Sequence, residues 1–258
     1  MKGHPDTFYE RKITLRTAGK ELEVDLYSDE AFRALAQLWI RAGWQRRISY
    51  EITWLGIPII QLPEDIVMMQ ELIWKVKPDV FIETGTAHGG TAVLYASMLE
   101  LLGKGHVVSV DVEIRKHNQL AIQSHPMSKR ITLIEGSSID ETVVSKIRKM
   151  IRPEDKVLVA LDSNHKYAHV LQELKKYSPL VTPGSYIVVF DSVMEILVDA
   201  PSGMSEWATD SPAAAIRDFL VEHPEFEVDP YYNRLTVTYC PSGFLKRGSI
   251  EPIALTDR

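Results

Sequence analysis

A carboxylate and three glycines stand together where an apolar run of the chain ends. The run at residues 80–82 leads into Glu83, and Gly85, Gly89 and Gly90 follow before a helical stretch. Glycines let a backbone approach a ligand closely, and a helix that starts there offers free N–H groups. The spacing of Gly85 and Gly89 does not fit the G-x-G-x-x-G pattern of dinucleotide enzymes. An acid at Glu83 suits a cationic ammonium group better than a pyrophosphate, which favours S-adenosylmethionine as the ligand.

Two later groups of residues extend the same expected site. Asp111 ends the next apolar run, roughly 20 residues beyond the glycines, where an acid can accept hydrogen bonds from both ribose hydroxyls. The segment 136–138 follows the third run, where its loop could bond the adenine edge. The residues expected to bind the methyl donor are Glu83, Gly85, Thr86, His88, Gly89, Gly90, Asp111, Val112, Gly136, Ser137, Ser138 and Asp162.

Acidic and imidazole side chains follow the fourth and fifth apolar runs. Asp162 ends the fourth run, His165 stands three positions later, and Asp191 ends the fifth run. Chemistry in an open α/β sheet sits at the carboxyl ends of the strands, so these side chains are expected to meet. Asp162 and Asp191 could hold a hard cation such as Mg²⁺. His165 could take a proton from a substrate hydroxyl as general base, and the oxygen would then attack a sulfonium methyl group.

The elements that must position these residues are apolar runs, rich in β-branched residues, that alternate with helical stretches. Such near-continuous apolar strands are buried on both faces, as in a parallel sheet. The five runs are 80–83, 107–112, 131–135, 157–162 and 186–191. After a helix at 211–222, two shorter runs at 226–229 and 235–240 are spaced as an antiparallel hairpin.

This order of elements predicts an α/β fold with a doubly wound, mostly parallel, seven-stranded sheet and a C-terminal antiparallel hairpin. That layout separates class I methyltransferases, which are Rossmann-like, from nucleotide-dependent dehydrogenases. Parallel strands place their carboxyl ends at one edge, which brings the expected donor and catalytic residues to the same side.

The N-terminal part of the chain has a different pattern. Residues 11–27 alternate apolar and polar on both sides of a short turn, which predicts a hairpin. Helices are predicted at 29–42, with Gly43 as the stop, and at 64–75. The expected division is an N-terminal elaboration at 1–62 (acceptor lid or oligomer contacts), an S-adenosylmethionine-binding domain at 63–247 and a tail at 248–258.

Acceptor specificity is expected from aromatic residues outside the sheet. The loop at 199–210 contains Trp207 and is long enough to act as a lid. Tyr50 and Trp54 in the N-terminal elaboration are the other candidates.

Composition limits the possible partners. The chain has 258 residues and a formal net charge of −6, so no overall basic field favours nucleic acid. Cys240 is the only cysteine, which excludes an internal disulfide and predicts a buried strand thiol. The charged N-terminus has no signal-peptide pattern, and no run is long enough to cross a bilayer. We therefore expect a cytoplasmic protein with no membrane or nucleic-acid partner.

Several of these motifs together resemble the cephalosporin hydroxylase family, whose relatives include sugar O-methyltransferases of rhamnosyl and macrolide pathways. The similar stretches are Gly56, 61–65 (QLPED), 82–90 (IETGTAHGG), 135–138 (EGSS) and 161–165 (LDSNH). The resemblance spans about residues 55 to 247. It implies a class I fold, S-adenosylmethionine binding, frequent homo-oligomerisation and often a divalent cation, usually magnesium. The family name records one member's pathway step and does not settle the chemistry.

The same resemblance implies a catalytic pattern: an aspartate at the end of strand four, a histidine three positions on, and paired acids after strand five. Asp162, His165 and Asp191 match it, but Phe190 stands where the first paired acid is expected. The leading hypothesis is O-methylation of a small hydroxylated acceptor, such as a sugar or a glycosylated natural product. One alternative is a hydroxylase, whose iron would need two histidines and a carboxylate where only His165 is well placed. The other is a cofactor-binding protein without catalysis, an idea that Phe190 keeps open.

Overall fold

A computed structural model of the protein describes residues 11–17 and 19–249. Its centre is a seven-stranded sheet with the order β10-β11-β9-β8-β5-β6-β7. The strands are β5 (Val80–Thr84), β6 (His106–Asp111), β7 (Ile131–Glu135), β8 (Val157–Leu161), β9 (Tyr186–Val189), β10 (Phe226–Val228) and β11 (Phe244–Arg247). Only β11 runs against its neighbours β9 and β10. This confirms the predicted α/β class and mostly parallel sheet.

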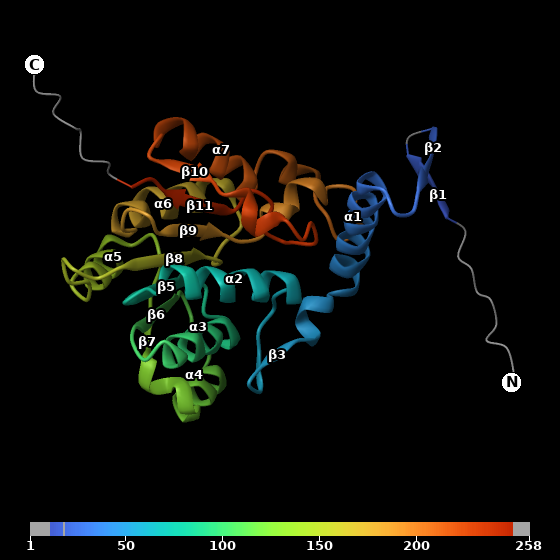
Figure 1. Cartoon of the computed structure of the whole chain (residues 1–258). Helices are drawn as coiled ribbons and strands as arrows, with labels where there is room; N and C mark the ends of the chain where they lie inside the picture. Colours follow the sequence, from blue (N-terminus) through green and yellow to red (C-terminus); the bar gives the residue numbers. More distant parts are fainter. Residues whose placement is uncertain (1–10, 18, 250–258) are drawn as a thin grey trace, which may run out of the picture.

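Two helical layers cover the sheet because neighbouring strand residues point to opposite faces. Phe81 packs with α2 (Pro63–Val76) and α3 (Gly90–Leu101), whereas Ile82 packs on the other side with α5, α6 and α7. Figure 1 shows these layers. The remaining α-helices are α1 (Asp29–Arg46), α4 (Lys116–Ser124), α5 (Glu141–Arg148), α6 (Tyr167–Tyr177) and α7 (Pro212–Glu222). The short 3-10 helices are η1 (Ile48–Glu51), η2 (Pro126–Arg130), η3 (Ser178–Leu180), η4 (Ser192–Ile196), η5 (Ser205–Ala208) and η6 (Pro230–Asn233).

The second strand of the C-terminal hairpin is not where the sequence predicts it. Residues 235–240 form no strand, and the partner of β10 is β11, further along the chain. The buried carboxylate of Asp65 accepts hydrogen bonds from the Thr238 hydroxyl at 2.5 Å and from the Tyr239 N–H at 2.8 Å. Thr238 in turn accepts from the Cys240 N–H at 2.8 Å. The N–H groups of Tyr239 and Cys240 are therefore not available to pair with a neighbouring strand. Cys240 is buried as predicted, but it lies outside a strand.

At the N-terminus, the predicted hairpin is present as β1 (Lys12–Thr17) and β2 (Lys20–Asp25). The prediction that α1 stops before Gly43 is wrong, because the helix continues to Arg46 and ends at Arg47 in the left-handed region. Gly43 serves packing instead: a Cβ there would lie 2.7 Å from Ile48 Cδ1. A short pair, β3 (Thr53–Trp54) and β4 (Ile57–Pro58), leads back to α2. Residues 1–10 and 18 of the predicted N-terminal elaboration and 250–258 of the predicted tail lie outside the described residues.

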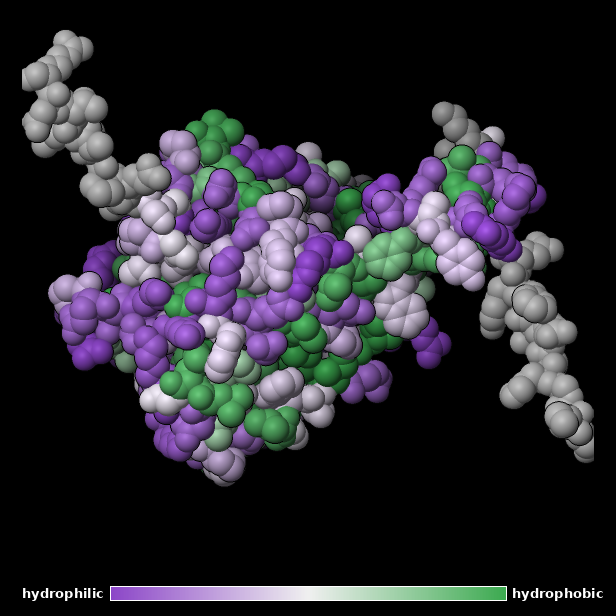
Figure 2. Space-filling model, viewed as in Figure 1, coloured by the Kyte–Doolittle hydropathy of each residue, from purple (hydrophilic) through white to green (hydrophobic). Residues whose placement is uncertain are grey.

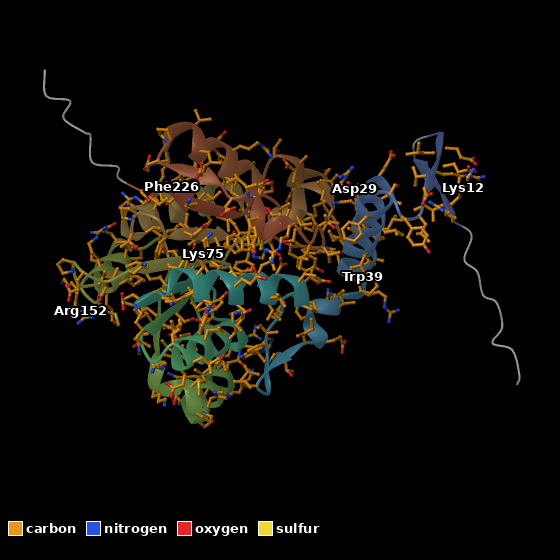
Figure 3. The ribbon with its side chains drawn as sticks, in the orientation of Figure 1. Lys12, Asp29, Trp39, Lys75, Arg152 and Phe226 are labelled. Carbon is orange, nitrogen blue, oxygen red and sulfur yellow. The ribbon has the colours of Figure 1, made fainter. Side chains whose placement is uncertain are left out.

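Figure 1 shows α1 and the β1–β2 hairpin extending from one end of the sheet domain. In the side-chain view, Asp29 and Trp39 lie on α1, at the far end of the molecule from Arg152 (Figure 3). Within the described part of the chain, no helix combines the length and apolarity needed to cross a membrane.

Asp65 gives the fold a testable pH dependence. Burial raises the pKa of its carboxyl to about 7, against the opposing hydrogen bonds from Thr238 and Tyr239. Because the pKa is higher in the folded than in the unfolded chain, its contribution to stability is complete below about pH 4 and is lost as the pH rises through about 7. We expect the free energy of unfolding to fall more between pH 5 and pH 8 in the wild type than in Asp65→Asn, by about 1 kcal/mol or more. Urea unfolding at both pH values measures this, and parallel pH profiles would contradict it.

Candidate active site

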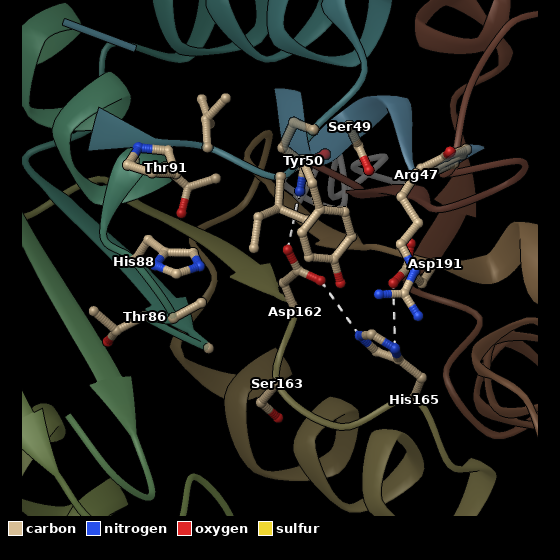
Figure 4. Close-up of a pocket in the computed structure, with 18 of the residues that line it drawn as sticks. Arg47, Ser49, Tyr50, Thr86, His88, Thr91, Asp162, Ser163, His165 and Asp191 are labelled. Carbon is tan, nitrogen blue, oxygen red and sulfur yellow. Dashed lines mark hydrogen bonds and ion pairs between the residues drawn. The ribbon is translucent and has the colours of Figure 1, made fainter. Parts of the chain in front are cut away.

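A cavity of about 440 Å³ opens at the carboxyl ends of the central strands. One wall is the turn after β5, at residues 85–91, and the floor carries the residues that end β8 and β9. The opposite wall comes from the N-terminal elaboration and from the segment after β9. The sheet edge predicted from the sequence is therefore hollowed, and it holds Asp162, His165 and Asp191 (Figure 4).

Glycines form the β5 turn because the neighbouring backbone is too close for a side chain. Gly85 has φ of 92°, and a Cβ there would lie 2.0 Å from the carbonyl oxygen of Asp162. A Cβ on Gly90 would lie 2.2 Å from the Pro58 carbonyl oxygen. The turn is thus clamped between the end of β8 and the strand β4. The first turn of α3 then presents its N–H groups at the cavity wall.

Glu83 lies beneath this turn rather than on the cavity wall. Its side chain is 1% exposed and accepts a hydrogen bond of 2.5 Å from the Ser109 hydroxyl. Ser109 also bonds Thr86 Oγ1 at 2.7 Å, so the three polar groups brace the turn from below. Burial raises the pKa of Glu83 to about 8, and the bond from Ser109 opposes that shift.

The residues expected around the nucleoside lie outside the cavity lining. Asp111 accepts hydrogen bonds from the backbone N–H groups of Ala87, at 2.9 Å, and Glu113, at 3.2 Å. Val112 beside it is exposed. Of Gly136, Ser137 and Ser138, the last is buried and its hydroxyl bonds His169 Nε2 at 3.1 Å instead of facing the cavity.

The three predicted catalytic side chains meet in one cluster. His165 Nε2 lies 3.5 Å from Asp162 Oδ1, and His165 Nδ1 lies 3.2 Å from Asp191 Oδ2. Burial lowers the pKa of His165, but the charge of Asp191 and the contact with Asp162 outweigh it and raise the pKa to about 9. Burial raises the pKa of Asp162 to about 7 and raises that of Asp191 as well. The imidazole therefore lies between two carboxyl groups, whose negative charge favours its protonated form.

This cluster also fits a divalent cation. One ligand atom each from Asp162, His165 and Asp191 lie within 4.8 Å of one another. His165 Nε2 is buried without a hydrogen-bond partner among the described residues. Carboxylate oxygens are the ligands that Mg²⁺ prefers. Phe190 adds no ligand, since its ring is 2% exposed and packs in the core formed with α2 and α3.

Gln61 is a site residue that the sequence reasoning did not assign. Its side-chain nitrogen donates to Asp162 Oδ2 at 3.0 Å, which fixes the carboxylate opposite His165. Gln61 is 5% exposed, and its Oε1 has no partner among the described residues. Gln61 lies in the QLPED stretch that carries the family resemblance. Only that resemblance could have identified it as a site residue from the sequence.

Aromatic side chains form the wall opposite the β5 turn. Trp44 packs edge-on against Trp207, with ring centroids 6.0 Å apart, and against Tyr239 at 5.2 Å. Trp207 and Tyr50 line the cavity as expected. Trp54 does not, because its indole N–H donates to Ser97 Oγ at 3.0 Å on α3.

A second polar cluster lies below Asp162, within the loop that follows β8. His169 Nε2 lies 3.2 Å from Ser163 Oγ, and Ser163 donates to the buried carboxylate of Glu173 at 2.7 Å. His169, on α6, therefore contacts the loops after β7 and β8 through Ser138 and Ser163. Among the described residues the Asp162 cluster thus holds a single histidine, which does not supply the two-histidine iron site of the hydroxylase alternative.

Comparison with known proteins identifies related sequences and folds. The model of the family described as rhamnosyl O-methyltransferase/CmcI matches residues 46–248. The rhamnosyl O-methyltransferase of Mycobacterium tuberculosis is 30% identical over 224 residues, which cover 83% of this chain and 85% of that protein. The rhamnosyl O-methyltransferase of Mycobacterium leprae is 32% identical over 142 residues, which cover 54% of this chain and 60% of the Mycobacterium leprae protein.

Two solved CmcI structures share the fold. The apo structure of CmcI-N160 has a TM-score of 0.56 at 17% identity, covering 78% of this chain and 77% of CmcI. The structure of CmcI-D160 with Mg and SAM has a TM-score of 0.55 at 17% identity, covering 78% of each chain.

The contact between the turns after β5 and β8 can be tested with a matched pair of glycine variants. Gly56 and Gly85 have nearly equal φ values, 90° and 92°, but a Cβ on Gly56 meets nothing within 4 Å. Gly56→Ala should lose only about 1 kcal/mol of stability from left-handed strain, whereas Gly85→Ala should lose about 3 kcal/mol or more because its Cβ meets backbone. Chemical denaturation measures both. Equal losses would show that the clamp at Gly85 does not exist.

Proposed function

The chain belongs to the rhamnosyl O-methyltransferase/CmcI family, and from that premise we propose that it transfers the methyl group of S-adenosylmethionine to a sugar hydroxyl of a small acceptor or glycosylated natural product. It is an S-adenosylmethionine-dependent O-methyltransferase. The observation that carries the proposal is the Asp162–His165–Asp191 cluster, which faces the glycine-rich turn across one cavity.

We assign the donor to the β5 turn and the edge beside it. The methionine part lies over Gly85 and the first turn of α3, with Asp162 as the acid on the cavity wall beside its ammonium group and Glu83 beneath the turn. The ribose hydroxyls bond Asp111, and the adenine ring lies between Val112 and the loop 136–138. Asp111 is already oriented by the Ala87 and Glu113 amides, which leaves its other lone pairs for the ribose.

In the reaction, His165 takes the proton of the acceptor hydroxyl. The acceptor oxygen attacks in line, so that the C–O bond forms as the C–S bond breaks and S-adenosylhomocysteine leaves. His165 must first give up the proton that its raised pKa retains in the free protein. Positive charge beside Asp162 and Asp191, such as that of the donor, offsets their field and lowers the pKa of His165 toward neutrality.

Asp162 and Asp191 would hold a divalent cation, which, when bound, polarises an acceptor hydroxyl as a Lewis acid. With Phe190 in place of an acid, the chain would supply the two carboxylates as ligands and keep the imidazole of His165 free as the base. Gln61 holds Asp162 in position by its bond to Oδ2. This arrangement keeps the acceptor side of the cluster ordered before the substrates bind.

The N-terminal elaboration at 1–62 has two roles in this proposal, while residues 63–247 bind the donor. Its described part contributes Trp44 and Tyr50 to the acceptor side of the cavity.

The outer surface of the elaboration makes contacts in a homo-oligomer. The apolar face of α1 that supports this is exposed by 41% to 56% at Phe32, Leu35, Leu38 and Trp39. Figure 2 shows apolar surface where α1 and the β1–β2 hairpin leave the body. A hairpin of two strands is only marginally stable alone, so contacts with a second copy would stabilise it.

Donor binding and catalysis should separate in two variants. Asp111→Asn removes a charged acceptor for the ribose, so it should weaken S-adenosylhomocysteine binding by about tenfold or more. His165→Gln should change that affinity by less than about threefold and abolish release of S-adenosylhomocysteine with a panel of rhamnosides. Calorimetry with magnesium and with EDTA measures the first, and a coupled product assay the second. Loss of donor binding in both variants would contradict the assignment.

The oligomer proposal predicts a change in mass. Leu35→Glu combined with Trp39→Glu should convert the oligomer to a monomer, because two charges would be buried in the α1 contact. Val221→Glu on α7, where the side chain is 84% exposed, is the control and should not change the mass. Light scattering after size exclusion measures all three proteins. A monomeric wild type, or a double variant with unchanged mass, would contradict the proposal.

A further inference from the structure

Arg47 occupies a backbone position that does not favour arginine. It ends α1 in the left-handed region with φ of 53°, and its N–H donates to the Gly43 and Trp44 carbonyls. Its own carbonyl accepts from the Tyr50 N–H at 3.0 Å, which begins η1. Glycine or asparagine adopts this conformation with less strain. The backbone bonds on both sides therefore fix the direction in which the Arg47 side chain leaves the turn.

That direction is the cavity. Arg47 lines it, and it is the only lysine or arginine among the lining residues. No carboxylate of the described chain lies within 4.0 Å of its guanidinium, although nearby Arg41 pairs with Asp199. Figure 4 shows Arg47 on the side of Asp191 and His165, with Thr86, His88 and Thr91 of the donor turn on the other side of Asp162.

We propose that Arg47 binds an anionic group of the acceptor, so that the substrate class is a sugar carrying a carboxylate or a phosphate near the hydroxyl that is methylated. This proposal rests on the proposed methyltransferase function. A planar guanidinium binds either anion through two parallel hydrogen bonds. Trp44, Trp207 and Tyr239 line the cavity on the same wall, where the sugar ring can pack against an aromatic face. An anion held at Arg47 leaves the rest of the sugar on the side of His165, where a free hydroxyl can reach the imidazole.

The donor contains the other anion that could reach the cavity, its methionine carboxylate. Two donor probes separate these sources: S-adenosylhomocysteine has this carboxylate and 5′-methylthioadenosine does not. If Arg47 binds the acceptor, Arg47→Met should leave the affinity for both probes unchanged.

The decisive experiment titrates the S-adenosylhomocysteine complex with three sugars and follows tryptophan fluorescence. The probes are methyl glucuronide, glucose 1-phosphate and, as the neutral control, methyl glucoside. The wild type should bind at least one anionic sugar about tenfold more tightly than the neutral sugar. Arg47→Met should lose this preference, and Arg47→Lys should keep part of it. Arg47→Gly should lose the preference without lowering the melting temperature, since glycine suits the left-handed turn.

Three results would overturn the proposal: no anion preference in the wild type, a preference that survives in Arg47→Met, or weaker binding of S-adenosylhomocysteine but not of 5′-methylthioadenosine in that variant. The last result would assign the guanidinium to the donor. Absence of S-adenosylhomocysteine binding in the wild type would instead contradict the methyltransferase function itself.

Discussion

The turns that follow β5 and β8 touch at Gly85, where the carbonyl oxygen of Asp162 occupies the place that a side chain would need. This close approach sets the distance between the donor turn and the catalytic cluster. It is possible because β5 and β8 are adjacent parallel strands in register, with Thr84 opposite Leu161, so that their ends reach the same level. Asp162 therefore belongs to both halves of the site: its backbone supports the donor turn, and its carboxylate faces His165 and Gln61.

The charges of the cluster make the base depend on what is bound. In the free protein the two carboxylates stabilise the imidazolium form of His165, with a pKa of about 9. The protonated imidazole has no free lone pair with which to accept a proton. In the proposed mechanism, positive charge bound beside Asp162 and Asp191 would offset their field, so that His165 would serve as the base mainly when the site is loaded.

Local patterns in the sequence were sufficient to predict the sheet and most of the cluster. β-branched runs fix the parallel strands, and the residue types at their ends place Asp162, His165 and Asp191 at one edge. Features that depend on contacts distant in sequence were missed. Residues 235–240 alternate like a strand, yet the Thr238 hydroxyl and the Tyr239 N–H donate to Asp65, which lies 173 and 174 positions earlier in the sequence. Gly43 was misjudged for a local reason: it looks like a helix stop, but α1 continues past it and Ile48 packs where its side chain would lie. Gln61 and Arg47 line the cavity because the N-terminal elaboration folds over the edge of the sheet. The local periodicity of the sequence does not show this arrangement.

The central claim is that this cavity transfers a methyl group from the sulfonium to a hydroxyl oxygen. The most direct measurement uses S-adenosylmethionine with a deuterated methyl group and a panel of neutral and acidic glycosides, followed by mass spectrometry and fragmentation of the products. We predict that one acceptor gains a single deuterated methyl group on oxygen, with one S-adenosylhomocysteine formed for each product. Donor that is bound but never consumed, or an acceptor that gains oxygen instead of the labelled methyl group, would contradict the account.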